Sequence, residues 1–166
     1  MLGAIAQELP AGAQLTILER PLELPIFNTD HAEPAEATTL KQAIADADGV
    51  VFSVPEYNYS IPGGLKNALD WISCPPATSP LRAKAVAMVG AASGMSGTIR
   101  AQVHMRSMLV YSDSAVLGQP EVTIPRAQDR FDAAGQLHDE STRLLLAKFG
   151  VAFVAFVQRH LATHGT

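Results

Sequence analysis

Residues 55–64 combine side chains and backbone groups that could bind a planar heterocycle. The segment carries Glu56, Tyr57, Asn58 and Tyr59, and it ends in two glycines where a helix is predicted to begin. Free backbone amides in such a loop can hydrogen-bond the carbonyl and ring-nitrogen edge of a heterocycle, while a tyrosine covers a ring face. From these residues alone, a capped turn whose tyrosines pack on neighbouring side chains is an equally good interpretation.

A second segment, residues 90–97, has the small side chains that allow a ligand to approach the backbone closely. It includes Ser93, Gly94 and Gly97 and leads into a predicted helix. The pattern matches neither a phosphate-binding loop ending in Gly-Lys-Ser/Thr nor the dinucleotide fingerprint. A flexible connection is therefore the alternative interpretation, and the position of the segment after a strand favours binding more than its composition does.

The other residues with chemical potential form no recognisable site. Five histidines are scattered without metal-ligand spacing, and the closest pair, His160 and His164, has no Cys, Asp or Glu nearby to complete a set. The single cysteine, Cys74, cannot form an internal disulfide and lacks a flanking base. We expect no metal site and no nucleophile. Arg100 and Arg106 are candidates for interface ion pairs or for a nucleotide phosphate, although a solvated helix face is the more common role of such residues.

The two segments follow predicted strands in an alternating pattern of strands and helices. Apolar runs at 50–54 and 84–89 have the composition of buried parallel strands, and further strands are expected at 14–18 and within 114–124. Helices are predicted at 1–9, 38–47 with Thr38 or Thr39 as its N-cap, 63–73, 98–111 and 140–162. This alternation indicates a parallel α/β fold, in which ligands bind at the carboxyl ends of the strands.

The composition limits the size and the surroundings of the protein. A chain of 166 residues with 48% apolar residues predicts one folded domain, 1–166. A net charge of −4 gives no general attraction to nucleic acid or acidic lipid. The longest apolar run, 151–157, is shorter than the roughly 20 residues that span a bilayer, and the N-terminus does not resemble a secretory signal. We expect a cytoplasmic protein that neither enters a membrane nor binds nucleic acid.

Residues 55–71 read Pro-Glu-Tyr-Asn-Tyr-Ser-Ile-Pro-Gly-Gly-Leu-Lys-Asn-Ala-Leu-Asp-Trp. This stretch closely resembles the signature of the NADPH-dependent FMN reductases, a flavodoxin-like group that includes quinone, chromate and azo-dye reductases. The similarity continues through 90–102 and 119–122, and it includes a region of similar type at 131–142. The resemblance implies a flavodoxin-like, three-layer, doubly wound parallel sheet.

The resemblance also implies a flavin enzyme. FMN would be the cofactor, NADPH or NADH the cosubstrate, and a quinone or other small molecule the electron acceptor, with the two substrates stacking in turn over one ring face. The implied cofactor-binding residues, which act largely through their backbone, are Pro55, Glu56, Tyr57, Asn58 and Tyr59 in the first segment and Ser93, Gly94 and Gly97 in the second. No side chain is required as a catalytic acid or nucleophile. A homodimer or homotetramer is implied, because the helix that begins near Gly63 usually builds a dimer interface in this family.

One part of the family pattern has no counterpart in the sequence. Family members begin with a strand and a Gly-Ser, Arg and Ser/Asn loop that binds the FMN phosphate, whereas this sequence begins within the following helix. We therefore expect a sheet that lacks its first strand, between 14–18 and 50–54, and whose open edges need another partner. Three explanations of the absent strand and loop are open: upstream sequence that is omitted, a segment exchanged with a partner, or the loss of tight flavin binding.

Two functions compete with a reductase. One is a flavin-free α/β domain that acts only as a binding or oligomerisation partner, and its case is the absent phosphate loop. The other is a one-electron carrier like flavodoxin, which the 55–71 signature disfavours because that signature belongs to the reductases.

Overall fold

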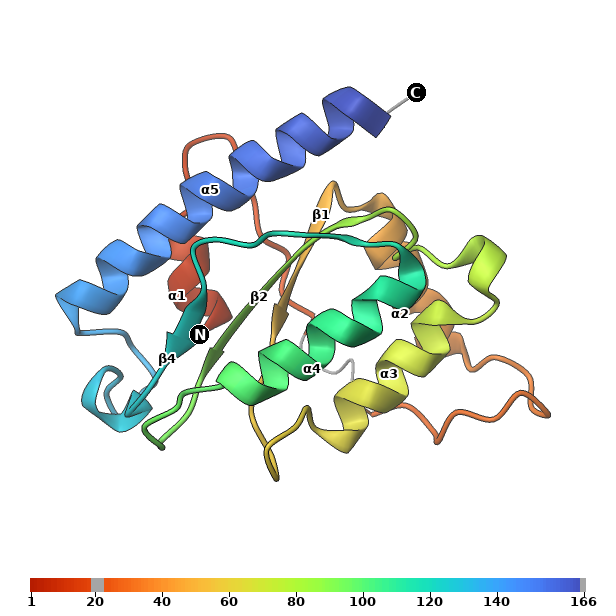
Figure 1. The fold of residues 1–166 in the computed structure, drawn as a ribbon, viewed down its shortest axis with the longest axis horizontal. Coiled ribbons are helices and arrows are strands. Elements are labelled where there is room, and N and C mark those ends of the chain that lie inside the picture. Colours follow the sequence, from red (N-terminus) through yellow and green to blue (C-terminus); the bar gives the residue numbers. More distant parts are fainter. Residues whose placement is uncertain (19–22, 165–166) are drawn as a thin grey trace.

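A computed structural model of the chain describes residues 1–18 and 23–164. A parallel sheet separates two layers of helices, with α1 and α5 on one face and α2, α3 and α4 on the other (Figure 1). The helices are α1 Leu2–Gln7, α2 Ala35–Asp46, α3 Gly63–Ser73, α4 Ile99–Leu109 and α5 Glu140–His164. The strands are β1 Gly49–Ser53, β2 Ala85–Ala91, β3 Ala115–Val116 and β4 Val122–Ile124. This arrangement confirms the predicted α/β fold of flavodoxin type.

The most buried strand, β2, organises the sheet. It pairs in parallel with β1 along one edge, with Gly49 opposite Ala85, and with both β3 and β4 along the other. Six of its seven residues are buried, as a near-continuous apolar run predicts for a strand covered on both faces. Since all four strands run in the same direction, the carboxyl ends of β1, β2 and β4 lie together at one end of the sheet, which we call its carboxyl edge, at the bottom of Figure 1.

The long helix α5 and the short helix α1 cover one face of the sheet. Phe149 of α5 and Ile5 of α1 are fully buried in the core that they share with β2 and β4. Asp139 caps α5 by accepting hydrogen bonds from the hydroxyl of Thr142 at 2.6 Å and from its amide at 2.8 Å. These hydrogen bonds hold the pKa of Asp139 well below its usual range, so the cap is a carboxylate at neutral pH.

On the opposite face, α3 holds an irregular segment of chain against the protein. Asn67 accepts a hydrogen bond from the amide of Phe27 at 2.7 Å and donates to the carbonyl of Pro25 at 2.9 Å. Trp71 donates to the same carbonyl at 2.8 Å, and its ring meets that of Phe27 edge-on with centroids 4.9 Å apart. Two residues one helical turn apart therefore fix this segment.

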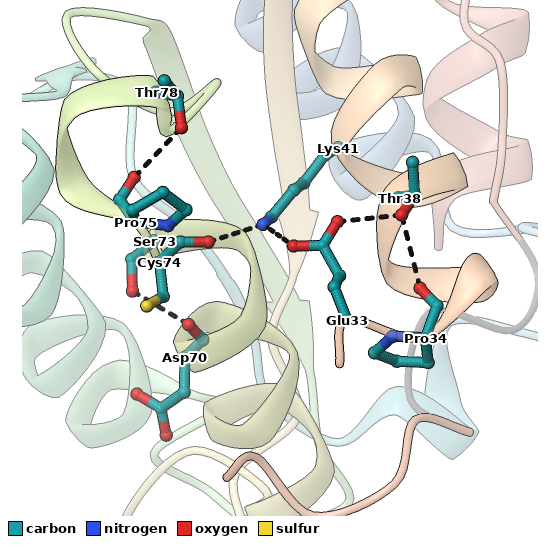
Figure 2. A network of polar contacts seen from close by, with 9 residues as sticks. All are labelled: Glu33, Pro34, Thr38, Lys41, Asp70, Ser73, Cys74, Pro75 and Thr78. Carbon is teal, nitrogen blue, oxygen red and sulfur yellow. Dashed lines mark hydrogen bonds and ion pairs between the residues drawn. The ribbon is translucent and has the colours of Figure 1, made fainter. Parts of the chain in front are cut away.

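A polar network joins α2 to the end of α3 (Figure 2). Lys41 forms an ion pair with Glu33 and donates to the carbonyl of Cys74 at 2.5 Å. Glu33 also accepts from the hydroxyl of Thr38 at 2.8 Å, and the Lys41 ammonium lowers the pKa of Glu33. The expectation that Thr38 or Thr39 caps α2 is wrong: the helix begins at Ala35, because the extended Pro34 is its N-cap.

Two expectations about strands also need correction. Residues 14–18 form no strand, because a strand is defined by its ladder and none of the described strands pairs with this segment. The stretch 114–124 contains two short strands, β3 and β4, which pair with different parts of β2.

The helix predicted to extend to residue 111 ends at Leu109, and the chain continues as a 3-10 turn over Val110–Ser112.

Helix α5 is, among the described helices, the one that is long and apolar enough to cross a membrane. This is weak evidence for a membrane segment, since a helix that packs on a soluble core passes the same test, and Leu146, Phe149 and Phe153 are buried in this core. The absence of membrane insertion stays a prediction.

Candidate functional site

The loop that follows β1, residues 55–60, is a tight turn that we call the tyrosine loop. Tyr57 and Ser60 exchange backbone hydrogen bonds of 3.0 and 2.9 Å, which leaves Asn58 and Tyr59 as the two central residues. Both central residues have positive φ, 50° for Asn58 and 65° for Tyr59. The left-handed region is unfavourable for a tyrosine, so the surrounding structure must hold the turn in place.

Glu56 supplies much of that support. Its carboxylate accepts hydrogen bonds from the backbone amides of Arg100 at 3.0 Å and Ala101 at 3.3 Å, in the first turn of α4. The Arg100 guanidinium donates to the same carboxylate at 2.8 Å, and the Glu56 side chain is only 8% exposed. Burial alone would raise the pKa of Glu56, but the Arg100 guanidinium and the two amides outweigh it and lower the pKa. Glu56 therefore stays ionised and caps α4.

This arrangement separates the roles of the predicted residues in the tyrosine loop. The carboxylate of Glu56 is occupied by its hydrogen bonds to α4, so only the backbone of Glu56 can contact a ligand. Arg100 also lies over the Tyr59 ring, 4.1 Å from its centroid, which covers one face of that ring. Tyr57 is 64% exposed and has no such partner among the described residues. Tyr57 is thus the side chain best placed to cover a planar ligand.

The loop that follows β2, residues 92–97, is held by backbone contacts, and we call it the glycine loop. Ala92 donates to the carbonyl of Ile124 at 3.0 Å and accepts from the amide of Ala127 at 3.0 Å. The amide of Arg126 donates to the carbonyl of Gly94 at 3.2 Å. Main-chain bonds to the end of β4 and to the segment after it therefore tie this loop to the fold, whereas side chains tie the tyrosine loop to α4.

The glycines in and near the glycine loop differ in whether the fold leaves room for a Cβ. A Cβ at Gly90, in β2, would lie 2.1 Å from the Thr98 hydroxyl, and one at Gly97 would lie 2.9 Å from the backbone of Thr123. Gly97 also has a φ of +57°. A Cβ at Gly94 would meet nothing within 4 Å. The fold itself requires glycine at Gly90 and Gly97, while the space around Gly94 is open to solvent or to a ligand.

The backbone of the two loops fits a flavin ring. The amides of Asn58, Tyr59, Ser93 and Gly94 donate no hydrogen bond to any other group in the part of the chain that the structure describes. All four residues are exposed, so these donors are available to a ligand. Amides of this kind suit the oxygen and nitrogen edge of an isoalloxazine. The residues present therefore fit the ring of FMN at this edge of the sheet.

Two arginines from the sequence analysis have other tasks. Arg100 is engaged by Glu56 and Tyr59, and Arg106 donates to the carbonyl of Leu117 at 3.2 Å and lies 3.8 Å from Glu121. Arg100 is thus paired with a carboxylate, and Arg106 is bonded to a backbone carbonyl.

Sequence reasoning also missed Gln102, which is 3% exposed and donates to the carbonyl of Val122 at 2.9 Å and to the hydroxyl of Thr98 at 3.0 Å. Its position one helical turn after Thr98, on the buried side of the predicted helix, was the available signal.

A family model and several known proteins match most of this chain. Residues 1–129 match the model of the NADPH-dependent FMN reductase family. An NAD(P)H-dependent FMN reductase of Pseudomonas aeruginosa is 42% identical over 139 residues, which cover 82% of this chain and 75% of that protein. A quinone reductase of Escherichia coli is 37% identical over 166 residues, and the match covers 95% of this chain and 88% of that protein.

Solved structures give the same result. The NAD(P)H:(acceptor) oxidoreductase FerB, a flavoenzyme from Paracoccus denitrificans, superposes with a TM-score of 0.85 at 31% identity, over 96% of this chain and 88% of its own. The sequence match, the shared fold and the two loops at the carboxyl edge of the sheet lead to one conclusion: the chain belongs to the NADPH-dependent FMN reductase family.

Proposed function

We propose that the protein is an FMN-dependent NAD(P)H oxidoreductase that reduces quinones or other small acceptors. Relatives that carry the names FMN reductase, 2-hydroxy-1,4-benzoquinone reductase and quinone reductase support this function. When bound, FMN supplies the redox chemistry by accepting hydride from NAD(P)H and passing electrons to the acceptor. The protein's task is then to bind and orient the ring and its substrates.

The observation that carries the proposal is the pair of loops with free amides at the carboxyl ends of β1 and β2. The cofactor-binding residues that we propose are Pro55, Glu56, Tyr57, Asn58 and Tyr59 in the tyrosine loop and Ser93, Gly94 and Gly97 in the glycine loop. Amides of both loops bind the polar edge of the ring, and Tyr57 shapes the surface on which substrates stack. Glu56 and Gly97 contribute by fixing the backbone of their loops.

We also propose that the protein is a single-domain, cytoplasmic homo-oligomer that binds no nucleic acid and enters no membrane. Exposed apolar side chains on and just after α4 support self-association, because such groups favour contact with another chain. They are Ile99, Val103, Val110 and Tyr111. Size-exclusion chromatography with light scattering tests this: a dimer or tetramer supports the proposal, and a monomer at micromolar concentration contradicts it.

A visible absorption spectrum tests the proposed activity. The purified chain is mixed with FMN, separated from unbound flavin, and then given NADPH under anaerobic conditions. We expect flavin bands that stay with the protein and bleach on addition of NADPH, then return when a quinone is added. Protein that stays colourless after mixing would contradict the proposal and favour a flavin-free binding domain.

A further inference from the structure

Arg126 lies close to the proposed site, and the described part of the chain offers it no acidic partner. It lies two residues after β4, and the carboxyl end of β4 lies at the same edge of the sheet as the tyrosine and glycine loops (Figure 1). Two arginines nearby in sequence or space are paired, Arg100 with Glu56 at 2.8 Å and Arg130 with Asp139 at 2.7 Å. Among the residues that the structure describes, no carboxylate pairs with Arg126.

The backbone and the stem of Arg126 are fixed against the glycine loop. Its amide donates to the carbonyl of Gly94 at 3.2 Å, and its backbone is left-handed, with φ 48° and ψ 53°. The Nε atom donates to the sulfur of Met95 at 3.0 Å. Neither Nη atom makes a hydrogen bond in residues 1–18 or 23–164. The exposed guanidinium therefore keeps its two Nη atoms free beside a loop of the proposed site.

A guanidinium of this kind suits a phosphate group. Two parallel N–H donors match a pair of phosphate oxygens, and such charge-assisted pairs are stronger than neutral hydrogen bonds. The chain as a whole carries a net charge of −4, which repels a polyanion. A dinucleotide with charged phosphates therefore needs a local cation at the site, and Arg100 and Arg106, which the sequence offered for this role, are engaged elsewhere.

We propose that Arg126 binds a phosphate of the NAD(P)H cosubstrate and so contributes to its recognition. This inference rests on the proposed function. The shared chemistry is a phosphate dianion or the pyrophosphate, and both occur in NADPH, whereas NADH has only the pyrophosphate. FMN also carries a phosphate, so the test must separate cosubstrate binding from cofactor binding.

The test compares Arg126→Gln with the wild type and with a matched control, Arg82→Gln. Arg82 is also exposed and without an ion pair among the described residues, but it precedes β2 and so lies at the opposite edge of the sheet. Three quantities are measured: the Kd of adenosine 2′,5′-bisphosphate by calorimetry, the KM and kcat with NADPH and with NADH, and the Kd of FMN by fluorescence.

We expect Arg126→Gln to weaken binding of the bisphosphate about tenfold and to raise the KM for NADPH by a similar factor, with kcat and the Kd of FMN unchanged. Arg82→Gln should match the wild type in all three. A rise in KM for NADPH alone assigns Arg126 to the 2′-phosphate, and an equal rise for NADH assigns it to the pyrophosphate; either supports the proposal. Higher salt should weaken the binding of bisphosphate to the wild type more than to Arg126→Gln.

Three results would overturn the inference in different ways. Equal behaviour of Arg126→Gln and Arg82→Gln would show that Arg126 binds no phosphate of the cosubstrate. A weaker affinity for FMN with an unchanged KM for NADPH would assign the contact to the cofactor instead. A wild-type protein that neither binds FMN nor oxidises NADPH would instead refute the proposed function. That failure can be distinguished from failure of the inference about Arg126, because it is seen before any substitution is made.

Discussion

The tyrosine loop and the glycine loop lie at the ends of neighbouring strands, yet they are held in opposite ways. Side chains fix the tyrosine loop: the Glu56 carboxylate binds two amides of α4, and Ser60 contacts the ring of His104 at 3.0 Å. Backbone contacts fix the glycine loop, through main-chain bonds of Ala92 and Gly94 to the end of β4 and to the segment after it.

This difference shows that the sequence of the two loops is constrained in two different ways. A loop held by side chains depends on the identity of a few residues. A loop held by its backbone tolerates many side chains, except where a Cβ would collide.

The largest effect is expected where a Cβ would meet a crowded backbone. Gly90→Ala should destabilise the fold by about 3 kcal/mol, since its Cβ would lie 2.1 Å from the Thr98 hydroxyl and 2.5 Å from the carbonyl oxygen of Val54. Gly94→Ala serves as the control and should change stability by less than about 0.5 kcal/mol, because the space around Gly94 is open. Urea denaturation of both variants measures the difference, and equal stabilities would contradict this account of the glycines.

Loss of the Glu56 carboxylate should have the next largest effect. Glu56→Ala leaves two amides of α4 and the Arg100 guanidinium without their acceptor, which should destabilise the protein by about 2 kcal/mol and weaken FMN binding. Glu56→Gln keeps one acceptor oxygen and should recover part of both. Glu140→Gln, which removes an exposed carboxylate on α5, is the control and should change neither property. A stable Glu56→Ala variant with unchanged flavin affinity would show that the tyrosine loop does not depend on this carboxylate.

The contribution of Glu56 should also depend on pH. Because folding lowers the pKa of Glu56 below its ordinary value of 4.5, the stabilisation is complete above about pH 4.5 and is lost as pH falls through the lowered pKa. Denaturation of the wild type and Glu56→Gln from pH 7 to pH 3 follows this directly. The difference in their unfolding free energies should stay constant down to about pH 4.5 and shrink below it. A difference that grows on acidification would contradict the assigned direction.

The smallest effect distinguishes the two tyrosines. Tyr59→Leu removes the ring beneath Arg100 and should destabilise the protein by about 0.5 kcal/mol. Tyr57→Leu should leave stability unchanged but weaken FMN binding, since the exposed ring of Tyr57 has no such partner among the described residues. Parallel denaturation and flavin titrations separate the two roles, and identical profiles for both variants would remove the distinction.

Local patterns predicted much of the fold. The bounds of α3 agree with the prediction because Pro62 precedes it and Pro75 follows its end. The strands β1 and β2 were evident from apolar runs of strand length. Residues 14–18 show the limit of this reasoning, since alternation alone cannot create a strand without a neighbour to pair with.

The sequence motif locates the two loops but does not show how they are held, and the assignment of their residues to cofactor binding stays a prediction. The contact between Glu56 and Arg100 joins residues 44 positions apart, and only the fold brings them together. For that reason the sequence offers Glu56 only as a cofactor contact, and it offers Arg100 as a candidate for an interface ion pair, a nucleotide phosphate or a solvated helix face. The availability of Arg126 was equally hidden, since it depends on which carboxylates the other arginines occupy.

The central claim is that one flavin ring binds against both loops. Hydrogen exchange of backbone amides, measured by mass spectrometry with and without FMN, tests it most directly. We predict slower exchange in peptides that contain 55–60 and 92–97, because the free amides of Asn58, Tyr59, Ser93 and Gly94 gain an acceptor or lose contact with water. Unchanged exchange in both segments while FMN is bound, or protection confined to another part of the chain, would contradict the account.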